Sequence, residues 1–575
     1  MPTVPTPAWP PAWPFATGGD PERSRNAMVA TTDRYATEVG RDVLAGGGNA
    51  VDAAVAVCFA LAVVNPEAGN VGGGGFLLVR TPGGDLGALD FRSTAPRAAR
   101  RDTFLRGDGP PGDRSVLGHL AAAVPGSVRG LWDAWTRFGS TPWAELVQPA
   151  VELADGFPVT GRLTRSLPDR IVEGLARFPS SADVFLPGGK PPREGDVLRQ
   201  EHLARTLTRI RDLGPDGFYR GPFADLVVEE MERGGGLITR EDLASYRSVW
   251  REPVRFGYRG RTVVSMPPSS SGGVTLALTA HLLAGFDPTA HRWHGSEHVH
   301  LLAEAWRRAY VDRNRYLADP TFADVPTEVL TSPEYGAWRA GDVRPDRATP
   351  SSRVGPGVET FLEGGAPADA GDPTGAPGRE GAHTTHVSVV DGEGAAVALT
   401  TTLNTWYGSK LVVPGTGVLL NNEMDDLSTR PGSPNFFGLV QGEANAVEPG
   451  KRPLSAMTPT LVLGPDGRLE LVVGTPGGST IITTVFQVVS NILDHGMELA
   501  DAVAAPRVHH QHLPDEIRYE PGGLPQATVE GLRARGHRVL EWEELRGDVQ
   551  AVRVCRDGTL EGVADPRLGG SAAGV

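Results

Sequence analysis

Cysteine is scarce in this chain, which carries only Cys58 and Cys555 in 575 residues. Two cysteines provide neither a disulfide framework nor a cysteine metal cluster, so a small disulfide-stabilised module is excluded. Long hydrophobic runs are missing as well. The strongest apolar run, Ala50 to Val64, includes Asp52 and is shorter than the roughly 20 residues that a membrane span needs. The sequence therefore predicts no membrane partner.

Positive charge is in deficit, with 55 Lys and Arg residues against 69 Asp and Glu and a net charge of −14. The basic residues are scattered, so nothing favours a polyanion and no nucleic-acid partner is predicted. Residues 1–25 lack a basic start and are broken by prolines where a signal peptide needs an apolar run. We expect a disordered N-terminal tail and a cytoplasmic location, while a mis-assigned start site would leave export open.

Hydrophobic periodicity predicts a mixture of helices and strands. Ala50 to Val64 is apolar around most of its circumference, which is typical of a buried helix. Paired strands are expected at residues 76–80 and 86–91, and residues 295–317 favour a long helix with a charged face. Further helices are expected at 200–213, 222–233 and 479–493, with Ser479 as N-cap of the last, and further strands at 459–463 and 469–473.

The stretch that begins at His383 combines two contrasting compositions. Residues 354 to about 383 are rich in Gly, Pro, Ala and Asp and predict a flexible loop. From Thr384 onward, two β-branched runs joined by a short Asp-Gly-Glu-Gly segment predict strand, turn and strand. Thr384 therefore stands where a loose loop meets the first residue of a strand.

That position suggests a particular chemistry for Thr384. If the chain is cut after His383, the new terminal threonine carries a hydroxyl nucleophile and an α-amine whose ordinary pKa is roughly 7.7 to 8.0. One residue then supplies both nucleophile and general base. A β-branched strand residue after a surface loop gives the same pattern without any catalytic role, so the pattern alone leaves both interpretations open.

Several ordered segments resemble one protein family. HTTHVSVVD from His383 is followed by TTTLNTWYG and GVLLNNEMDDLS, and GKRPLSAMTPT and GTPGGSTIITT come later in the chain. Together with NVGGGGFLLV and LDFRSTAP nearer the N-terminus, these resemble the γ-glutamyltranspeptidases, which are self-cleaving N-terminal-nucleophile hydrolases. The resemblance covers the chain from about Asn26 to its end.

The resemblance implies an α+β fold, a four-layer αββα sandwich. It implies a large subunit of residues 26–383 and a small subunit of residues 384–575, interleaved in one domain and produced by cleavage between His383 and Thr384. No metal or cofactor is implied. His509, His510 and His512 invite a zinc interpretation, but no carboxylate or cysteine completes the usual ligand spacing, and we expect a surface role for them.

The resemblance also implies roles for individual residues. Catalytic roles fall to the nucleophile Thr384, to Thr402 as its hydrogen-bond partner, and to Gly477 and Gly478 as the oxyanion hole. Substrate-binding roles fall to Arg92, Asn404, Glu423, Asp426 and Ser455. Two departures stand out: Ala456 replaces a usual serine, and Phe437, in a lid loop from Pro434 to Asn445, replaces a usual tyrosine. We expect a looser lid.

The implied activity is transfer of the γ-glutamyl group of glutathione and related compounds to water, amino acids or peptides. Two alternatives remain open. A cephalosporin or glutaryl-amide acylase would use the same nucleophile on a substrate without an α-amino group, whereas a non-maturing binding protein would keep the fold without cleavage. Arg92 together with Asp426 favours a γ-glutamyl substrate, because an unpaired buried aspartate carries a desolvation cost.

Overall fold

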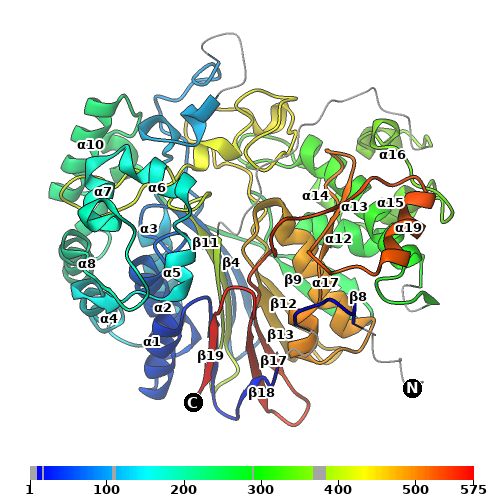
Figure 1. The fold of residues 1–575 in the computed structure, drawn as a ribbon, viewed down its shortest axis with the longest axis horizontal. Helices are drawn as coiled ribbons and strands as arrows, with labels where there is room; N and C mark the ends of the chain where they lie inside the picture. The colour runs from blue at the N-terminus through cyan, green and yellow to red at the C-terminus, as the bar shows by residue number, and fades with distance from the viewer. Residues whose placement is uncertain (1–8, 16–18, 106–111, 288–289, 367–383) are drawn as a thin grey trace.

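The computed structural model describes residues 9–15, 19–105, 112–287, 290–366 and 384–575, and these form two facing antiparallel sheets of seven strands each (Figure 1). In spatial order, the first sheet consists of β19 (Ser571–Gly574), β2 (Met28–Thr31), β10 (Thr384–Val390), β11 (Ala396–Thr402), β3 (Gly74–Arg80), β4 (Leu86–Asp90) and β7 (Val249–Arg251). The second consists of β1 (Glu22–Ser24), β18 (Leu560–Ala564), β17 (Gln550–Val554), β13 (Leu469–Gly474), β12 (Thr460–Leu463), β9 (Arg261–Ser265) and β8 (Val254–Tyr258). There are two smaller sheets. One contains β14 (Val508–His509), β15 (Ile517–Tyr519) and β16 (Val539–Glu541), and the other contains β5 (Phe157–Pro158) and β6 (Val197–Leu198).

Helices cover the outer face of each large sheet, as Figure 1 shows. The first sheet is covered by α1 (Arg34–Ala45), α2 (Ala50–Val64) and α3 (Ser127–Phe138), behind which lie α4 (Trp143–Asp155), α8 (Glu201–Leu213) and α10 (Gly221–Gly234). The second is covered by α12 (Gly272–Leu283), α17 (Ile481–Leu493) and α18 (Leu499–Ala504), with α13 (Ser296–Tyr316), α15 (Pro333–Ala340) and α19 (Gln526–Ala534) outside them. Shorter helices are α5 (Gly161–Arg165), α6 (Asp169–Ala176), α7 (Pro179–Phe185), α9 (Asp216–Tyr219), α11 (Arg240–Ser245), α14 (Thr327–Leu330) and α16 (Val358–Leu362). The expected αββα sandwich is confirmed.

Strands β10 and β11 lie at the centre of the first sheet and are buried on both faces. Their register places Thr384 opposite Thr402. On the face toward the second sheet, the imidazole of His386 packs against Gly474, where a Cβ atom would lie 2.3 Å from the ring carbon Cε1. The two sheets therefore approach closely near the first residue of β10.

Helix α2 has the bounds that its apolar sequence predicts, and every one of its side chains is buried. Asn49 and Asp52 form a capping box at its N-terminus, in which each side chain accepts a hydrogen bond from the other residue's backbone N–H. The Asp52 carboxylate also accepts a hydrogen bond from the Ser140 hydroxyl at 2.6 Å. The single charge in this apolar run is thus satisfied at the end of the helix.

Helix α13 confirms the long helix expected at residues 295–317. Its charged residues Glu304, Arg307, Arg308, Asp312 and Arg313 are all buried, which the sequence did not predict. Ion pairs to distant segments replace water: Arg307 contacts Asp515 at 2.9 Å and Asp312 contacts Arg339 at 3.1 Å. The helix is therefore an interior element of the second half of the sandwich.

The described part of residues 1–25 corrects the expected disordered tail. Trp13 is buried and its indole N–H donates a hydrogen bond to the Ala504 carbonyl at 3.0 Å. Residues 22–24 form β1, which pairs with β18 at the edge of the second sheet. The apolar indole provides packing area that the proline-rich composition did not suggest.

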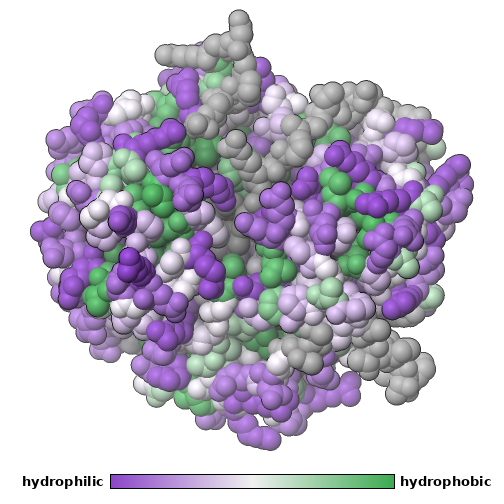
Figure 2. Space-filling view, in the orientation of Figure 1, coloured by the Kyte–Doolittle hydropathy of each residue, from purple (hydrophilic) through white to green (hydrophobic). Residues whose placement is uncertain are grey.

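Hydrophilic residues cover most of the face shown in Figure 2, and hydrophobic residues appear there in separate small areas. The large apolar side chains instead gather between the sheets and their helices. None of the helices in the described ranges has the length and apolar character that crossing a membrane requires.

Candidate active site

A cavity opens at the first residue of β10. Most of the residues that the sequence singles out reach its wall, although they come from segments far apart in the chain. The lining includes Arg92, Thr384, Thr402, Asn404, Asp426, Phe437, Ser455, Ala456 and Gly478, together with Arg313 and several apolar side chains.

The hydroxyls of Thr384 and Thr402 meet at the cavity wall. Thr384 Oγ1 donates to Thr402 Oγ1 at 3.1 Å, across the β10–β11 pair. The same Thr402 oxygen accepts from the backbone N–H of Asn404 at 2.9 Å. Asn404 has a φ of +80°, and its side-chain amide donates to the Asn422 carbonyl at 3.0 Å. These bonds fix the Thr384 hydroxyl and leave the Asn404 side-chain carbonyl as an acceptor for a ligand.

Gly477 and Gly478 form part of the connection between β13 and α17. Gly477 and Gly478 have φ values of +142° and +58°, which side chains rarely tolerate. Both glycines lie between β13 and α17, and Gly478 begins a 3₁₀ turn, Gly478–Thr480, that leads into α17. The N-cap of α17 is Thr480 rather than Ser479, because this turn is inserted before the helix. Gly478 lines the cavity, whereas Gly477, which precedes it in the chain, is absent from the described lining.

Arg92 is fully buried and lies between two carboxylates. Its Nη2 donates to Asp426, and its Nη1 lies 3.0 Å from Oε1 of Glu423. Burial raises the pKa of the Asp426 and Glu423 carboxyls, and the Arg92 guanidinium opposes that rise. Asp426 reaches the cavity, whereas Glu423 is absent from the described lining and contacts the site through Arg92.

Ser455 is held by a hydroxyl-rich turn before α12. Its carbonyl accepts from the backbone N–H and the hydroxyl of Ser271, at 2.7 and 2.6 Å, and its N–H donates to the Ser269 carbonyl at 3.0 Å. The Ser455 hydroxyl accepts from the Met457 N–H at 3.1 Å, so its proton is available to a ligand. Ala456, next in the chain, also lines the cavity and has no side-chain hydroxyl.

The lid loop is closed over the cavity. Phe437 is only 3% exposed, and its carbonyl accepts a hydrogen bond from Gln511 at 3.2 Å. The backbone N–H of Phe436 donates to the Asp425 carboxylate at 3.0 Å. Asn435 accepts from the N–H groups of Phe437 and Leu439, both at 3.1 Å. Backbone bonds of this kind hold the lid although residue 437 has no hydroxyl.

Arg313 is a cavity residue that the sequence interpretation missed. It belongs to α13 and is 2% exposed, yet it lines the same wall as Arg92 and Ser455. Its Nε donates to the Ser271 hydroxyl at 3.0 Å and its Nη1 to the side-chain carbonyl of Asn314 at 2.8 Å. The sequence places Arg313 in a helix with a charged face, and this pattern alone does not indicate that it reaches the cavity.

The three histidines near residue 510 are buried, which corrects the expected surface role. His509 contacts the Thr483 hydroxyl at 2.8 Å, and His512 contacts the Ser351 carbonyl at 3.0 Å. Burial lowers the pKa of His510 and of His512 to about 4, so both rings are neutral at ordinary pH. All three histidines form hydrogen bonds in the protein interior.

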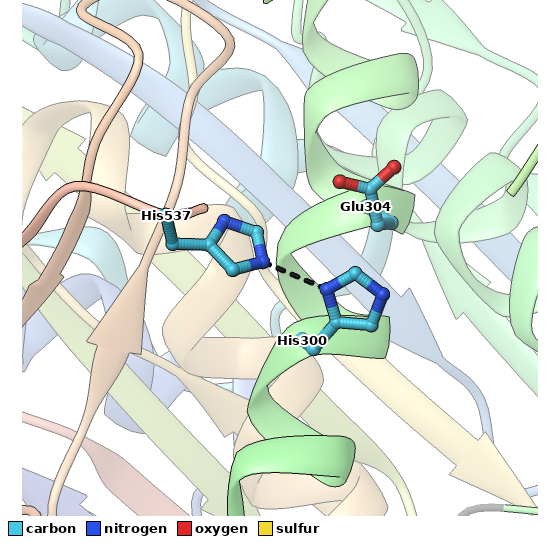
Figure 3. A group of neighbouring side chains, drawn as sticks. All are labelled: His300, Glu304 and His537. Carbon is cyan, nitrogen blue, oxygen red and sulfur yellow. Dashed lines mark hydrogen bonds between the residues drawn. The ribbon is translucent and has the colours of Figure 1, made fainter. Parts of the chain in front are cut away.

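A second cluster, His300, Glu304 and His537, brings potential metal ligands together (Figure 3). The two imidazoles point toward one another, with Nδ1 of His300 2.7 Å from Nε2 of His537. Nε2 of His300 donates to the Arg344 carbonyl at 2.7 Å, and Glu304 is paired with Arg307 and Arg308. Two adjacent guanidinium groups oppose a cation, so we assign this cluster to packing of α13.

Two facing sheets between helical layers, with a threonine at the first residue of a central strand, define an N-terminal-nucleophile hydrolase. The Gamma-glutamyltranspeptidase family model matches residues 36–575. The chain belongs to the γ-glutamyltranspeptidase family.

Individual relatives cover nearly the whole chain. It is 46% identical to the glutathione hydrolase proenzyme of Escherichia coli (strain K12), over 97% of this chain and 94% of that protein. It is 35% identical to the acylase ACY 1 proenzyme of Pseudomonas sp. (strain SE83), over 96% and 94%. The crystal structure of a cephalosporin acylase from Bacillus halodurans superposes with a TM-score of 0.80 at 27% identity, covering 98% of this chain and 99% of that one.

Proposed function

We propose that this protein is a self-cleaving γ-glutamyltransferase and glutathione hydrolase. The observation that carries the proposal is the Arg92–Asp426 pair beside the Thr384 hydroxyl in one cavity. A γ-glutamyl group presents an α-carboxylate and an α-ammonium at one end and the reacting carbonyl at the other. The greater identity to a glutathione hydrolase than to an acylase supports the same substrate class.

Maturation comes first in the proposed sequence of events. The Thr384 hydroxyl attacks the carbonyl of His383, the acyl group moves from nitrogen to oxygen, and water hydrolyses the ester. The products are a large subunit ending at residue 383 and a small subunit beginning with the free amine of Thr384. His383 lies outside the described residues, so the proposal rests on the position of Thr384 at the start of β10.

The mature Thr384 then acts on the substrate. Its amine accepts the hydroxyl proton as Oγ1 attacks the γ-carbonyl carbon, and the proton passes to the departing amine as the carbon–nitrogen bond breaks. The backbone N–H groups of Gly477 and Gly478 would stabilise the tetrahedral oxyanion. Water or an acceptor amine then attacks the γ-glutamyl ester, which releases Thr384 for another cycle.

The remaining cavity residues would hold the amino-acid end of the substrate. The Asp426 carboxylate and the Asn404 side-chain carbonyl are acceptors for the ammonium. Arg92 and the Ser455 hydroxyl are donors for the carboxylate. Glu423 acts indirectly, because its contact is with the Arg92 guanidinium. Partners are therefore small molecules and the two subunits of the same precursor.

An acylase specific for glutaryl amides is the second candidate, and the acylase relative favours it. A substrate that lacks the α-ammonium would leave the cavity side of Asp426 without a partner. The loss of that interaction would cost on the order of 1–3 kcal/mol when the group is buried. Turnover of γ-glutamyl-p-nitroanilide and of glutaryl-p-nitroanilide by the same preparation distinguishes the two candidates.

The experiment that tests the proposed function combines mass and activity. Wild-type protein should yield two fragments, the smaller beginning Thr-Thr-His, and should hydrolyse γ-glutamyl-p-nitroanilide in preference to the glutaryl compound. Thr384→Ala should stay whole and inactive, while Thr384→Ser, which keeps a hydroxyl, should still be cleaved. A wild-type chain that remains intact on prolonged incubation would instead support a non-maturing binding protein.

A further inference from the structure

Arg313 is unusual among the buried arginines of the described residues. Eight other arginines are also buried, and each has a carboxylate oxygen within 4.0 Å. They are Arg92, Arg162, Arg307, Arg308, Arg339, Arg452, Arg507 and Arg567. Arg313 has no such partner among the described residues. A buried cation without an anion carries a large desolvation cost, so a ligand that supplies the anion would relieve it.

The contacts of Arg313 leave one end of its guanidinium available. Nε donates to the Ser271 hydroxyl and Nη1 to Asn314, and no described residue accepts from Nη2. The Ser271 hydroxyl in turn donates to the Ser455 carbonyl at 2.6 Å. Arg313 is therefore two hydrogen bonds from the backbone of Ser455, and both side chains line the cavity.

Arg92 is the more occupied of the two cations in the cavity. Its guanidinium already contacts the Asp426 and Glu423 carboxylates and donates from Nε to the Pro453 carbonyl at 3.2 Å. The positive charge of Arg92 and the negative charges of Asp426 and Glu423 sum to −1. The positive charge of Arg313 makes the total zero. A zwitterionic amino-acid group adds no net charge, and its two ends match Asp426 and Arg313, neither of which is fully engaged.

We propose that Arg313 is a second carboxylate-binding residue of the cavity, which binds the α-carboxylate of the γ-glutamyl group together with Ser455. This inference rests on the proposed function. Arg92 then serves mainly to hold Asp426 toward the substrate ammonium. Ala456 contributes no side-chain donor at this wall, so the guanidinium supplies an additional hydrogen bond that a planar anion can accept.

The protonation state of Arg313 is compatible with this role. Burial lowers its pKa to about 10, while Tyr310 and Asp426 oppose the decrease. The group therefore remains a cation at neutral pH. Ser271 keeps the guanidinium in place before substrate arrives, so little side-chain freedom is lost on binding.

The test compares two ligands across matched variants. L-glutamate and its α-amide differ only in the charge of the group that Arg313 would bind, and each inhibits hydrolysis of γ-glutamyl-p-nitroanilide with a measurable inhibition constant. Processed wild type should bind glutamate at least about tenfold more tightly than the amide, since hydrogen bonds to charged groups are the stronger ones. Arg313→Met should reduce this ratio at least about fivefold.

Two further variants separate binding from structure. Arg313→Lys keeps the positive charge but loses the planar guanidinium that donates two parallel hydrogen bonds. It should give an intermediate ratio of glutamate to amide binding. Arg315→Met removes an exposed arginine from the same helix and should leave the ratio unchanged. If Arg313→Met or Arg313→Lys weakens glutamate and the amide equally, the residue has a structural role only and the inference is wrong. Should Arg313→Met fail to mature, the lysine variant decides.

The proposed function can fail separately from this inference. A processed wild type that neither cleaves γ-glutamyl-p-nitroanilide nor binds L-glutamate would overturn both. A wild type that does both, with an unchanged ligand ratio in the Arg313 variants, would overturn the role of Arg313 alone.

Discussion

The ring of Phe437 lies directly over Gly478. A Cβ atom built on Gly478 would be 2.4 Å from Cε1 of that ring, a distance that non-bonded carbon atoms do not reach. The closed lid and the proposed oxyanion donor therefore occupy adjoining space. Movement of the lid and the position of the Gly478 N–H are expected to depend on one another.

Gly478→Ala should abolish turnover while allowing the protein to fold. The methyl group collides with Phe437, and the φ of +58° is unfavourable for alanine by on the order of 1–2 kcal/mol. Kinetics of γ-glutamyl-p-nitroanilide hydrolysis measure the loss. The double variant Gly478→Ala with Phe437→Ala removes the collision but not the backbone strain. Full recovery of activity in the double variant would show that the collision alone is responsible.

Phe437→Ala should raise KM more than it lowers kcat. The buried ring closes the cavity, and its removal opens the site to water while the Thr384 nucleophile is retained. We expect about a tenfold increase in KM, comparable to the loss of one well-packed contact. Phe437→Tyr is the matched variant: if the lid is loose for want of a hydroxyl, tyrosine should lower KM below the wild-type value. An unchanged KM in both variants would contradict a gating role.

Thr402→Val should slow self-cleavage and turnover together. Valine keeps the β-branched shape that packs in β11 but cannot accept from the Thr384 hydroxyl or from the Asn404 N–H. The loss of a neutral hydrogen bond predicts a rate decrease of about fivefold or more for each process. Thr402→Ser, which restores the oxygen, should behave like the wild type. Intact-mass time courses and steady-state kinetics provide the two rates.

Local sequence patterns predicted much of the architecture. Helix α2 coincides with the expected Ala50 to Val64 because a continuous apolar run and its Asn49 cap are contained in one segment. Strands β10 and β11 were predicted for a similar reason, since their β-branched residues and intervening turn are contiguous. Most of the residues that the family resemblance implied line one cavity, whereas Glu423 and Gly477 are absent from its described lining and His383 lies outside the described residues. The catalytic and binding roles of these residues stay predictions.

Features that depend on distant partners were not predictable in this way. The burial of the charged residues of α13 was not predictable, because their counter-ions, such as Asp515 and Arg339, come from remote parts of the chain. Trp13 was assigned to a tail because its contact with Ala504 spans almost the whole sequence. Arg313 belongs to the same group, since only the folded structure shows that it reaches the cavity.

Asp425 connects the lid to pH. Its carboxylate accepts from the Ser115 hydroxyl at 2.7 Å and from the Phe436 N–H at 3.0 Å. Burial raises its pKa to about 6, with a further contribution from the nearby Asp426 charge, and these two hydrogen bonds limit the rise. The ionised form, which prevails above pH 6, is the stronger acceptor and should hold the lid closed.

The effect on folding has the opposite sign. A carboxyl whose pKa is higher in the folded than in the unfolded state gives stability below the unfolded value, near 3.8, and that stability is lost as pH rises through about 6. Asp425→Asn cannot titrate, so its apparent melting temperature should fall less than that of wild type between pH 4 and pH 7. Asp33 and Asp548, whose pKa values burial also raises to about 6, remain in both proteins and cancel in the comparison.

Asp425→Asn should therefore separate lid closure from stability. In wild type, KM for γ-glutamyl-p-nitroanilide should decrease as pH rises through about 6, because the ionised Asp425 secures Phe436. In the variant that decrease should disappear, while the ionisation of Thr384 and of the substrate continues to shape the kcat profile. Parallel KM profiles for the two proteins would assign the pH dependence to another group and leave Asp425 a purely structural acceptor.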